Sequence, residues 1–364
     1  MGKRAFLTLE DGSVYEGYSF GAKSTTYGEV VFNTSMSGYQ EMLTDPSYAG
    51  QILVLTYPLI GNYGVNDAFF ESKQVQVRGL VVREHCLAPS HWQSAGSLAE
   101  FLKANGTPGI SGVDSRALTR RLRSAGVMMG ILSSEMTPEE ALQELKGLPN
   151  YDATDFVKQV AIDEKYQWGL ASDNAALLYH IAIVDMGLKY NIARLLTQLG
   201  CLVTVVPCTM AVEEILKLKP DGIVLSPGPG DPALLGYMTE TVRKLVQRKP
   251  VMGICLGHQM IGTAFGARTF KLKFGHRGGN HPVRDLSTGR VYITTQNHGY
   301  AVDADSLKDG LEVSQVNLND GTVEGLRHRE LPVTSIQYHS EGSPGPQDNV
   351  YLFDSFLQMV KEGQ

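Results

Sequence analysis

Residues 250–261, which read PVMGICLGHQMI, combine a short apolar run, one cysteine and the start of an amphipathic segment. The run from Val251 to Ile254 is typical of a buried parallel strand, and the residues after Gly257 predict a helix. Cys255 lies between them in a Gly-x-Cys-x-Gly arrangement, the thiol counterpart of a turn that presents a nucleophile between strand and helix. The free N–H groups of the helix start favour a thiolate there. The stretch predicts an α/β sheet with a cysteine nucleophile, although buried cysteines also serve simply for packing.

A second pair of polar residues follows a later apolar segment. Residues 333–338 predict a strand, and the glycines and prolines after Glu341 predict a loop. If the strand geometry continues, His339 and Glu341 project from the same side, because alternate residues of a strand share a face. This spacing suits a Cys–His–Glu relay, in which His339 takes the thiol proton and Glu341 orients the imidazole. The alternative is a histidine at a strand end beside a solvated charge.

The C-terminal half of the chain alternates between apolar runs and amphipathic segments. Apolar runs lie at 181–184, 202–206, 222–225 and 251–254, with helical patterns at 190–199, at 211–218 and up to residue 247. Such alternation predicts a doubly wound, mostly parallel sheet. Ligands of these sheets bind outside the carboxyl ends of the strands, where Cys255 and the glycine-rich loop 226–230 both fall. We therefore expect residues 179–364 to form one α/β domain with its site at this edge.

Residues 1–150 follow a different pattern. Short β-rich segments separated by turn residues lie at 5–9, 14–20, 29–33, 52–56 and 75–82, and helical patterns follow at 97–104, 115–125 and 138–146. We expect a separate α+β domain here, without a catalytic motif of its own. The periodicity fades between residues 151 and 178, which predicts a connector.

Length and composition fit a globular chain of about two domains. The 364 residues carry a formal net charge of −6 with a pI near 5.9, which argues against a nucleic-acid or anionic-membrane surface. No apolar run approaches the roughly 18 residues of a membrane span. The cysteines Cys86, Cys201, Cys208 and Cys255 lack the spacing of a metal site and are too few for a disulfide framework. We expect a cytoplasmic protein that binds neither nucleic acid nor membrane.

Residues 253–259, GICLGHQ, together with the downstream His339-x-Glu341, resemble the class I glutamine amidotransferases. The resemblance covers nearly the whole chain and is narrowed further by motifs at 28–34, 38–41, 44–48, 273–278 and 296–300, which are similar to those of the small, glutamine-hydrolysing subunits of carbamoyl phosphate synthetases. The first three of these motifs lie in an N-terminal region that other amidotransferases of this class lack.

The resemblance implies hydrolysis of the glutamine side-chain amide. Cys255 would attack the amide, His339 would transfer the proton and Glu341 would orient His339. His258 lies near the cysteine in the sequence, but the family assigns the base to the distant histidine. The substrate contacts that the resemblance implies are Ser47, Gly228, Gly230, Leu256, Gln259, Asn297, Gly299 and Tyr300.

The loop 226–230 lacks the Lys-Ser/Thr ending of a phosphate-binding loop. As a source of backbone N–H groups it fits better, because glycines let the main chain approach a ligand closely. In the family this loop and the residue after the nucleophile form the oxyanion hole, here Gly228 and Leu256. Two residues depart from the family pattern: Pro227 replaces a common asparagine, and Ser340 replaces the usual proline.

The resemblance also implies the partners. We expect no metal or organic cofactor in this chain, because His276 and His281 show no further metal ligands around them. ATP and its metal ion are expected only on a large synthetase subunit, to which residues 1–150 would dock. The sequence leaves open a catalytically silent docking subunit and the glutaminase of a different amidotransferase. It also leaves open whether the product serves pyrimidine or arginine synthesis.

Overall fold

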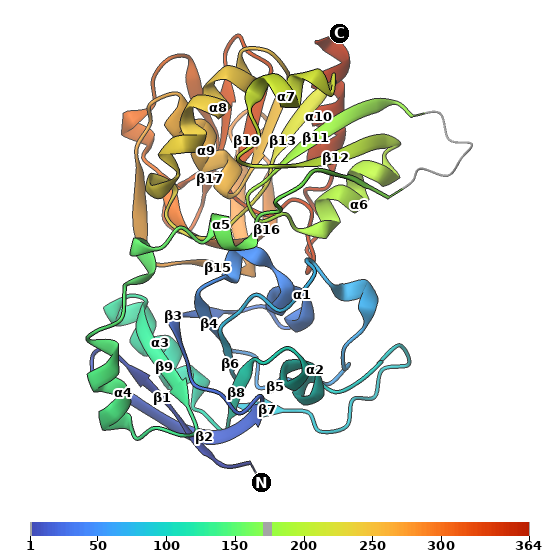
Figure 1. Cartoon of the computed structure of the whole chain (residues 1–364). Coiled ribbons are helices and arrows are strands. Elements are labelled where there is room, and N and C mark those ends of the chain that lie inside the picture. The colour runs from blue at the N-terminus through green and yellow to red at the C-terminus, as the bar shows by residue number, and fades with distance from the viewer. Residues whose placement is uncertain (1, 170–176, 364) are drawn as a thin grey trace. The chain divides into compact units, whose positions relative to one another are not determined.

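The computed structural model describes residues 2–169 and 177–363 (Figure 1). The chain divides into two compact units, Met1–Thr154 and Asp155–Gln364. The predicted connector is only partly irregular, since α5 (Val157–Val160) and β10 (Tyr166–Trp168) belong to the second unit. Val157 is fully buried in the core of that unit, which explains why this segment folds with it. Residues 170–176 of the predicted connector lie outside the described residues.

A closed barrel forms the centre of the first unit. Its strand order is β1-β2-β8-β6-β4-β3-β9, and β9 pairs with both β3 and β1. The strands are β1 (Arg4–Leu9), β2 (Val14–Gly21), β3 (Thr26–Asn33), β4 (Gln51–Leu55), β6 (Gly79–Val81), β8 (Pro108–Ser111) and β9 (Met128–Ser133). Closure leaves no free sheet edge, and the side chains of Leu7, Leu9 and Val30 are fully buried.

Short helices and a small second sheet complete the first unit. They are α1 (Tyr39–Thr44), α2 (Leu98–Ala104), α3 (Ser115–Ala125), α4 (Pro138–Leu145) and the paired strands β5 (Leu59–Ile60) and β7 (Glu84–His85). The starts of α2 and α4 are fixed by capping boxes, Ser97 with Glu100 and Thr137 with Glu140. The predicted strand at 75–82 shortens to β6, and the sequence pattern does not indicate α1, β8 or β9.

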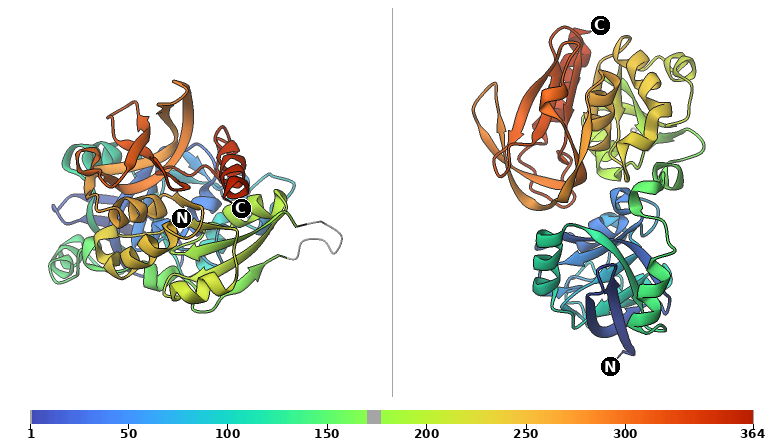
Figure 2. Two further views of the ribbon diagram at one scale, coloured as in Figure 1. Left: turned by 90° about the horizontal axis from the view of Figure 1, so that it is seen from above. Right: turned by 90° about the vertical axis from the view of Figure 1, so that its left-hand side faces the viewer.

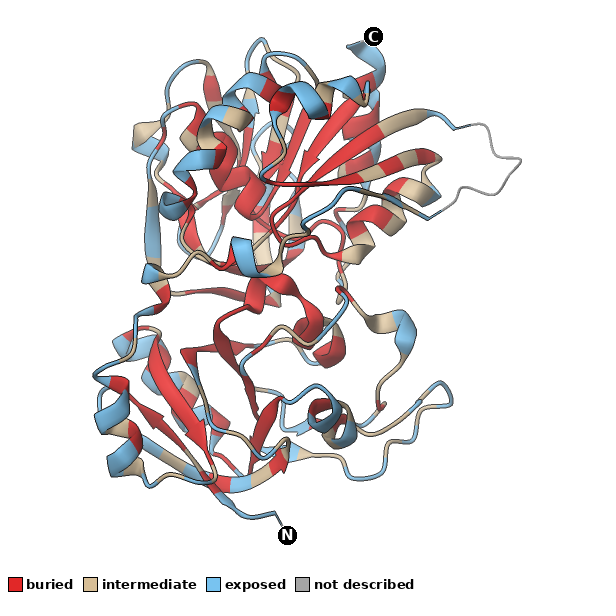
Figure 3. Ribbon diagram, in the orientation of Figure 1, coloured by how far each residue is buried: buried red, intermediate tan, exposed pale blue. Residues whose placement is uncertain are grey.

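The second unit contains a ten-stranded sheet of order β10-β12-β11-β13-β14-β19-β18-β17-β15-β16. Its central strands β12 (Cys201–Pro207), β11 (Tyr179–Asp185), β13 (Gly222–Leu225), β14 (Val251–Ile254) and β19 (Val333–Ile336) are parallel to one another. In Figure 3 these strands are largely red, which marks buried residues. Burial on both faces explains why they read as continuous apolar runs.

Helices cover the two faces of this parallel region. Ile181 and Ile183 of β11 pack in the cluster that contains α6 (Tyr190–Gln198) and α10 (Tyr351–Glu362). Ala182 and Val184 point to the other face, into the cluster of α7 (Val212–Lys217), α8 (Gly236–Val246) and α9 (Leu256–Ala264). Alternate residues of one strand thus serve opposite faces, and the predicted doubly wound arrangement is confirmed.

An antiparallel extension continues the sheet beyond β19. It consists of β18 (Val323–His328), β17 (Leu311–Asn317), β15 (Thr269–Asp285) and β16 (Val291–Val302). In the right-hand view of Figure 2 these orange strands lie to one side of the yellow helices of the second unit. The sequence analysis did not predict this extension as strands. Across the described residues, 2–169 and 177–363, none of the helices combines the length and apolar character needed to cross a membrane.

Candidate active site

Cys255 occupies a sharp turn between β14 and α9. Its φ of 53° and ψ of −104° lie in a backbone region that residues other than glycine rarely adopt. Flanking glycines make the turn possible: a Cβ atom on Gly253 would lie 2.6 Å from the carbonyl oxygen of Gly257, and one on Gly257 would lie 2.3 Å from that of Leu225. Cys255 is 2% exposed, and its thiol donates to the carbonyl oxygen of Asn297, with Sγ 3.6 Å away. The chain thus contains the predicted strand–turn–helix elbow.

His339 and Glu341 lie in the turn after β19. Because β19 ends at Ile336, the predicted continuation of strand geometry is wrong. The N–H of Gly342 donates to the carbonyl oxygen of His339, which closes a turn that a strand does not make. Within this turn Nδ1 of His339 lies 2.6 Å from Oε1 of Glu341. Nε2 of His339 is buried and has no hydrogen-bond partner among the described residues, so this nitrogen is the one available to a reacting group.

Neighbouring charges strongly shift the pKa values of His339 and Glu341. Burial alone would lower the pKa of His339, but the Glu341 carboxylate and the Cys255 side chain raise it to about 10, against the opposing charge of Lys189. Burial would raise the pKa of the Glu341 carboxyl, but Lys189 and His339 lower it to about 2. At neutral pH the structure therefore favours an ionised Glu341 beside a protonated His339.

The sequence analysis missed two polar residues that hold this turn. Nζ of Lys189, a residue 2% exposed, lies 3.1 Å from Oε1 of Glu341 and 2.8 Å from the carbonyl oxygen of Gly342. Asn191 donates from Nδ2 to the carbonyl oxygen of Glu341. Lys189 stands immediately before α6, where a cation opposes the helix dipole. That unfavourable position is the sequence signal that could have indicated an anionic partner.

Residues of β16 and α9 lie beside the cysteine. Asn297, Gly299 and Tyr300 belong to β16, and the carbonyl oxygen of Asn297 accepts from the thiol. Nε2 of Gln259, on α9, donates to the carbonyl oxygen of Tyr300 at 2.9 Å and to Oε1 of Gln337 at 3.0 Å. Three of the residues named for substrate contact, Gln259, Asn297 and Tyr300, therefore make hydrogen bonds at the elbow or on the helix that follows it, and Gly299 lies between the last two in β16.

The glycine-rich loop follows β13, the neighbour of β14. The N–H of Met186 donates to Oγ of Ser226 at 2.8 Å, which fixes the loop start. A Cβ atom on Gly228 would lie 2.3 Å from the carbonyl oxygen of Met186 and 2.7 Å from Cδ2 of Leu256, so only glycine permits this approach. Gly230 has a φ of 94°. The two residues predicted to form an oxyanion hole, Gly228 and Leu256, are thus in contact at the carboxyl edge of the sheet.

Ser47 belongs to the first unit and the elbow to the second, so its predicted contact with glutamine stays a prediction. It sits in the short helix η1 (Pro46–Tyr48), where its N–H donates to Oδ1 of Asp45 at 2.9 Å. Nδ2 of Asn33 donates to the hydroxyl of Tyr48 at 2.8 Å, which links the turn to β3. The Ser47 hydroxyl is buried and has no partner among the residues that the structure describes.

His258 is directed to a different partner. It is fully buried on α9, with Nδ1 2.9 Å from Oγ of Ser335 on β19, and burial lowers its pKa to about 3.

The two residues that depart from the family pattern are Pro227, in the loop after β13, and Ser340, in the turn after β19. The Ser340 hydroxyl is buried and unpaired among the described residues, whereas the carbonyl oxygen of Pro227 accepts from Ser226.

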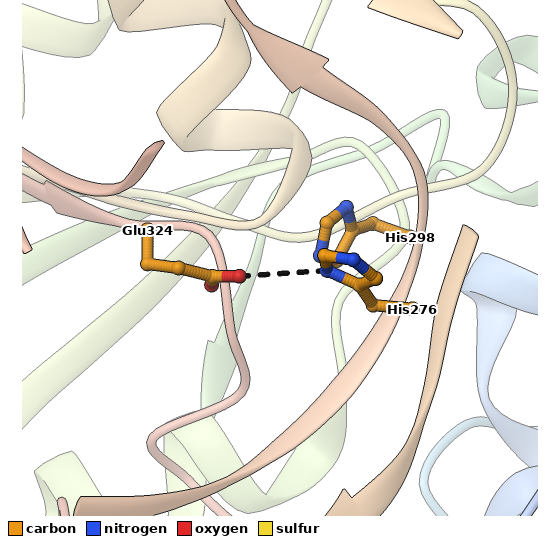
Figure 4. A group of neighbouring side chains, drawn as sticks. All are labelled: His276, His298 and Glu324. Carbon is orange, nitrogen blue, oxygen red and sulfur yellow. Dashed lines mark ion pairs between the residues drawn. The ribbon is translucent and has the colours of Figure 1, made fainter. Parts of the chain in front are cut away.

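His276, His298 and Glu324 could hold a metal ion, since one ligand atom from each lies within 4.8 Å of the others (Figure 4). The sequence analysis considered His276 with His281 and missed the other two, which lie on β16 and β18. Nδ1 of His276 lies 3.5 Å from Oε1 of Glu324, and its Nε2 lies 2.8 Å from Oδ2 of Asp320. Burial would lower the pKa of His276, but these two carboxylates raise it.

Hydrogen bonds within the chain already engage this group. Gln296 donates from Nε2 to Oε2 of Glu324 at 2.9 Å, and Asn317 donates to the other oxygen at 2.8 Å. His298 is bonded through Nδ1 to the carbonyl oxygen of Tyr300 and through Nε2 to Oε1 of Gln296, both at 2.8 Å. His276, His298 and Glu324 therefore belong to a buried polar network whose hydrogen bonds hold residues 296–300 in place.

The sequence matches two described families and several known proteins. Residues 7–132 match the family described as "Carbamoyl-phosphate synthase small chain, CPSase domain", and residues 182–359 match "Glutamine amidotransferase class-I". The chain is 50% identical to the "Carbamoyl phosphate synthase small chain" of Aquifex aeolicus, over 99% of this chain and 100% of that protein. The protein of the same name from Akkermansia muciniphila is 51% identical over 98% and 97%, respectively. The chloroplastic small chain of Oryza sativa is 46% identical over 99% of this chain and 83% of its own length.

Proposed function

Because the chain belongs to the family of carbamoyl-phosphate synthase small chains, we propose that it is the glutamine-hydrolysing subunit of such a synthase. It converts L-glutamine and water to glutamate and ammonia, and the ammonia passes to a large subunit that makes carbamoyl phosphate from bicarbonate and ATP. The observation that carries the proposal is the convergence of Cys255, His339 and Glu341 at the carboxyl edge of one parallel sheet.

In the first half-reaction Sγ of Cys255 attacks the carboxamide carbon of glutamine. The proton that the thiol gives up is held at Nε2 of His339, the protonated state that Glu341 favours, and the negative charge develops on the amide oxygen. Backbone N–H groups of Gly228 and Leu256 stabilise that oxygen, and one such donor is typically worth ~10²–10³ in rate. When the intermediate collapses, the C–N bond breaks and the leaving nitrogen takes the proton from His339. Ammonia and a γ-glutamyl thioester result.

The second half-reaction releases the enzyme. Nε2 of His339 accepts a proton from water while the water oxygen attacks the thioester carbon. The C–S bond breaks, glutamate forms, and the thiol regains its proton. Glu341 holds Nδ1 of His339 through the 2.6 Å hydrogen bond, so Nε2 faces the reacting atoms throughout.

Trapping of the nucleophile tests this proposal directly. The intact chain should be labelled at Cys255 by a chloroketone analogue of glutamine, and L-glutamine should protect it. Cys86, also a free thiol but partly exposed in the first unit, is the matched control and should not be protected. Labelling that ignores glutamine, or no glutamine hydrolysis by the complex with the large subunit, would favour a silent docking subunit instead.

We further propose that the chain acts as a heteromer, with the unit Met1–Thr154 providing the main contact to the large subunit. The support is the small-chain family itself and the absence of a catalytic motif from this part of the sequence. Hydrogen exchange of the intact chain with and without the large subunit tests it. Protection should concentrate in residues 2–154; protection only in residues 177–363 would contradict the docking role. The isolated chain should make no carbamoyl phosphate.

A further inference from the structure

Glu324 is a fully buried carboxylate on β18 that the reaction written above does not use (Figure 4). A hydrogen bond connects it to β16, the strand that carries Asn297, Gly299 and Tyr300. We propose that Glu324 is a positioning residue for glutamine: its two oxygens, as hydrogen-bond acceptors, hold residues 296–300 beside the elbow. It acts through its neighbours and not by contact with the substrate. The inference rests on the proposed glutaminase reaction.

Each oxygen of Glu324 engages one amide group. Oε2 accepts from Nε2 of Gln296 at 2.9 Å, and Oε1 accepts from Nδ2 of Asn317 at 2.8 Å. Gln296 is itself fully buried and immediately precedes Asn297, whose carbonyl oxygen accepts from the Cys255 thiol. A displacement of Gln296 would therefore move the main chain that lies next to the sulfur.

His298 extends this contact to the other end of the segment 296–300. Its Nε2 lies 2.8 Å from Oε1 of Gln296, and its Nδ1 lies 2.8 Å from the carbonyl oxygen of Tyr300. Both partners are acceptors, because Nε2 of Gln296 donates to Glu324. Burial lowers the pKa of His298, so the neutral imidazole donates to one partner and lies against the other. His298 therefore fixes the spacing between Gln296 and Tyr300.

These contacts close into a circuit that passes through α9. Nε2 of Gln259 donates to the carbonyl oxygen of Tyr300 and to Oε1 of Gln337, the first residue after β19. The N–H of Gln337 donates in turn to the main-chain carbonyl oxygen of Glu324 at 2.8 Å. Glu324 is thus connected to β16 by its side chain and to the end of β19 by its backbone. The circuit joins three elements that carry residues of the site.

Packing alone does not account for a carboxylate at this position. Burying a carboxylate is costly unless hydrogen bonds engage its oxygens, and an apolar side chain fills a buried space at lower cost. What Glu324 adds is a pair of acceptors, one directed to Gln296 on β16 and one to Asn317 on β17. Because a misplacement of about 1 Å can cost on the order of 10²-fold in rate, a fixed β16 matters for the reaction.

The experiment compares Glu324→Leu with Glu324→Gln in steady-state glutamine hydrolysis by the complex with the large subunit. Glu324→Leu removes both acceptors. It should raise KM for glutamine by about tenfold or more while kcat changes less, since residues 296–300 are predicted to bind glutamine throughout the reaction.

Glu324→Gln is the conservative variant and should keep KM within about twofold of the wild type, because an amide at this position still accepts from Asn317. Its NH₂ group can donate to Oε1 of Gln296 once the Gln296 amide turns. The turned amide then donates to Nε2 of His298, so the links of the circuit remain.

The rate at which iodoacetamide alkylates Cys255 separates positioning of β16 from a general effect on the fold. This small reagent does not use residues 296–300, so the rate in Glu324→Leu should stay near that of the wild type. Glu330→Leu removes an exposed carboxylate shortly after β18 and is the control, which should leave KM unchanged. If Glu324→Leu does not fold, Gln296→Met replaces it, because methionine has a similar length and leaves the bond from Asn317 to Glu324 in place.

An unchanged KM in the folded variant, or an alkylation rate that falls as far as the affinity for glutamine, would overturn the inference. A Glu324→Gln variant as impaired as Glu324→Leu would also overturn it, because the effect would then belong to the charge and not to the hydrogen bonds. Failure of the wild-type chain to react with the chloroketone would instead overturn the proposed function.

Discussion

The backbone N–H of Cys255 donates a 2.8 Å hydrogen bond to the carbonyl oxygen of Ile336. This bond continues the parallel pairing of β14 with β19, in which Ile254 lies opposite Ile336. The elbow and the turn that carries His339 therefore leave the sheet side by side. Distant parts of the sequence meet because their strands are neighbours, and the following predictions test what they do there.

Cys255→Ser should abolish glutamine hydrolysis, with a loss on the order of 10³-fold or more, because a hydroxyl is a poorer nucleophile in a site built for a thiol. The melting temperature should change little, since serine fits where the thiol lies. Steady-state glutaminase assays and thermal unfolding check both parts. Cys86→Ser is the control and should retain activity; a fully active Cys255→Ser variant would remove the cysteine from the mechanism.

His339→Asn should remove turnover, because no other group would transfer the proton between thiol, leaving nitrogen and water. His258→Asn should retain most of kcat and mainly reduce stability, since its ring bonds Ser335 and is kept neutral by burial. Measuring kcat and the free energy of unfolding for both variants separates the two histidines. Loss of turnover in the folded His258 variant alone would reverse the assignment.

The coupled charges should appear in the pH dependence of stability. The folded pKa of Glu341 lies below its unfolded value of 4.5, so its contribution is present above about 4.5 and lost as the pH falls towards 2. His339 has a raised pKa, so its contribution is present below about 6.5 and lost as the pH rises through 10. Urea unfolding across pH should show the difference between wild type and Glu341→Gln narrowing in acid. A constant difference would contradict the ion pairing.

Gly257→Ala should destabilise the second unit by about 1–3 kcal/mol, because the new Cβ would overlap a backbone carbonyl that cannot move freely. Activity should fall as well, since the elbow must shift to relieve the overlap. Gly236→Ala is the matched control: this glycine begins α8 and a Cβ there meets no atom within 4 Å. Denaturant unfolding should show the control as neutral or slightly stabilised, and equal effects would discount the close approach.

The local parts of this architecture could be read from the sequence, and the parts set by distant contacts could not. The apolar run 251–254 is a strand with the predicted ends, because a buried parallel strand has an unmistakable composition. Closure of the barrel through β1 and β9 depends on pairing between distant segments, and the short β8 contains proline and glycine.

The same holds for the site. Cys255, His339 and Glu341 could be named from their motifs, and the structure brings them together. The reason expected for the last two was wrong, since a turn and not a strand aligns them. Lys189 was missed because its partner lies far along the chain, and a single lysine before a helix carries no motif. The catalytic and binding assignments stay predictions until the variants are measured.

The neighbouring positions of β14 and β19 have an evolutionary consequence. Everything between them in sequence, including α9 and the four antiparallel strands of the extension, is an excursion from the parallel strands that returns to the position next to β14. Insertions or deletions within this excursion can change its length without altering the spacing of the two strand ends. Asn297 and Tyr300 belong to the excursion, whereas Cys255 and His339 border it. Selection can therefore change Asn297 and Tyr300, which are predicted to contact glutamine, independently of Cys255 and His339.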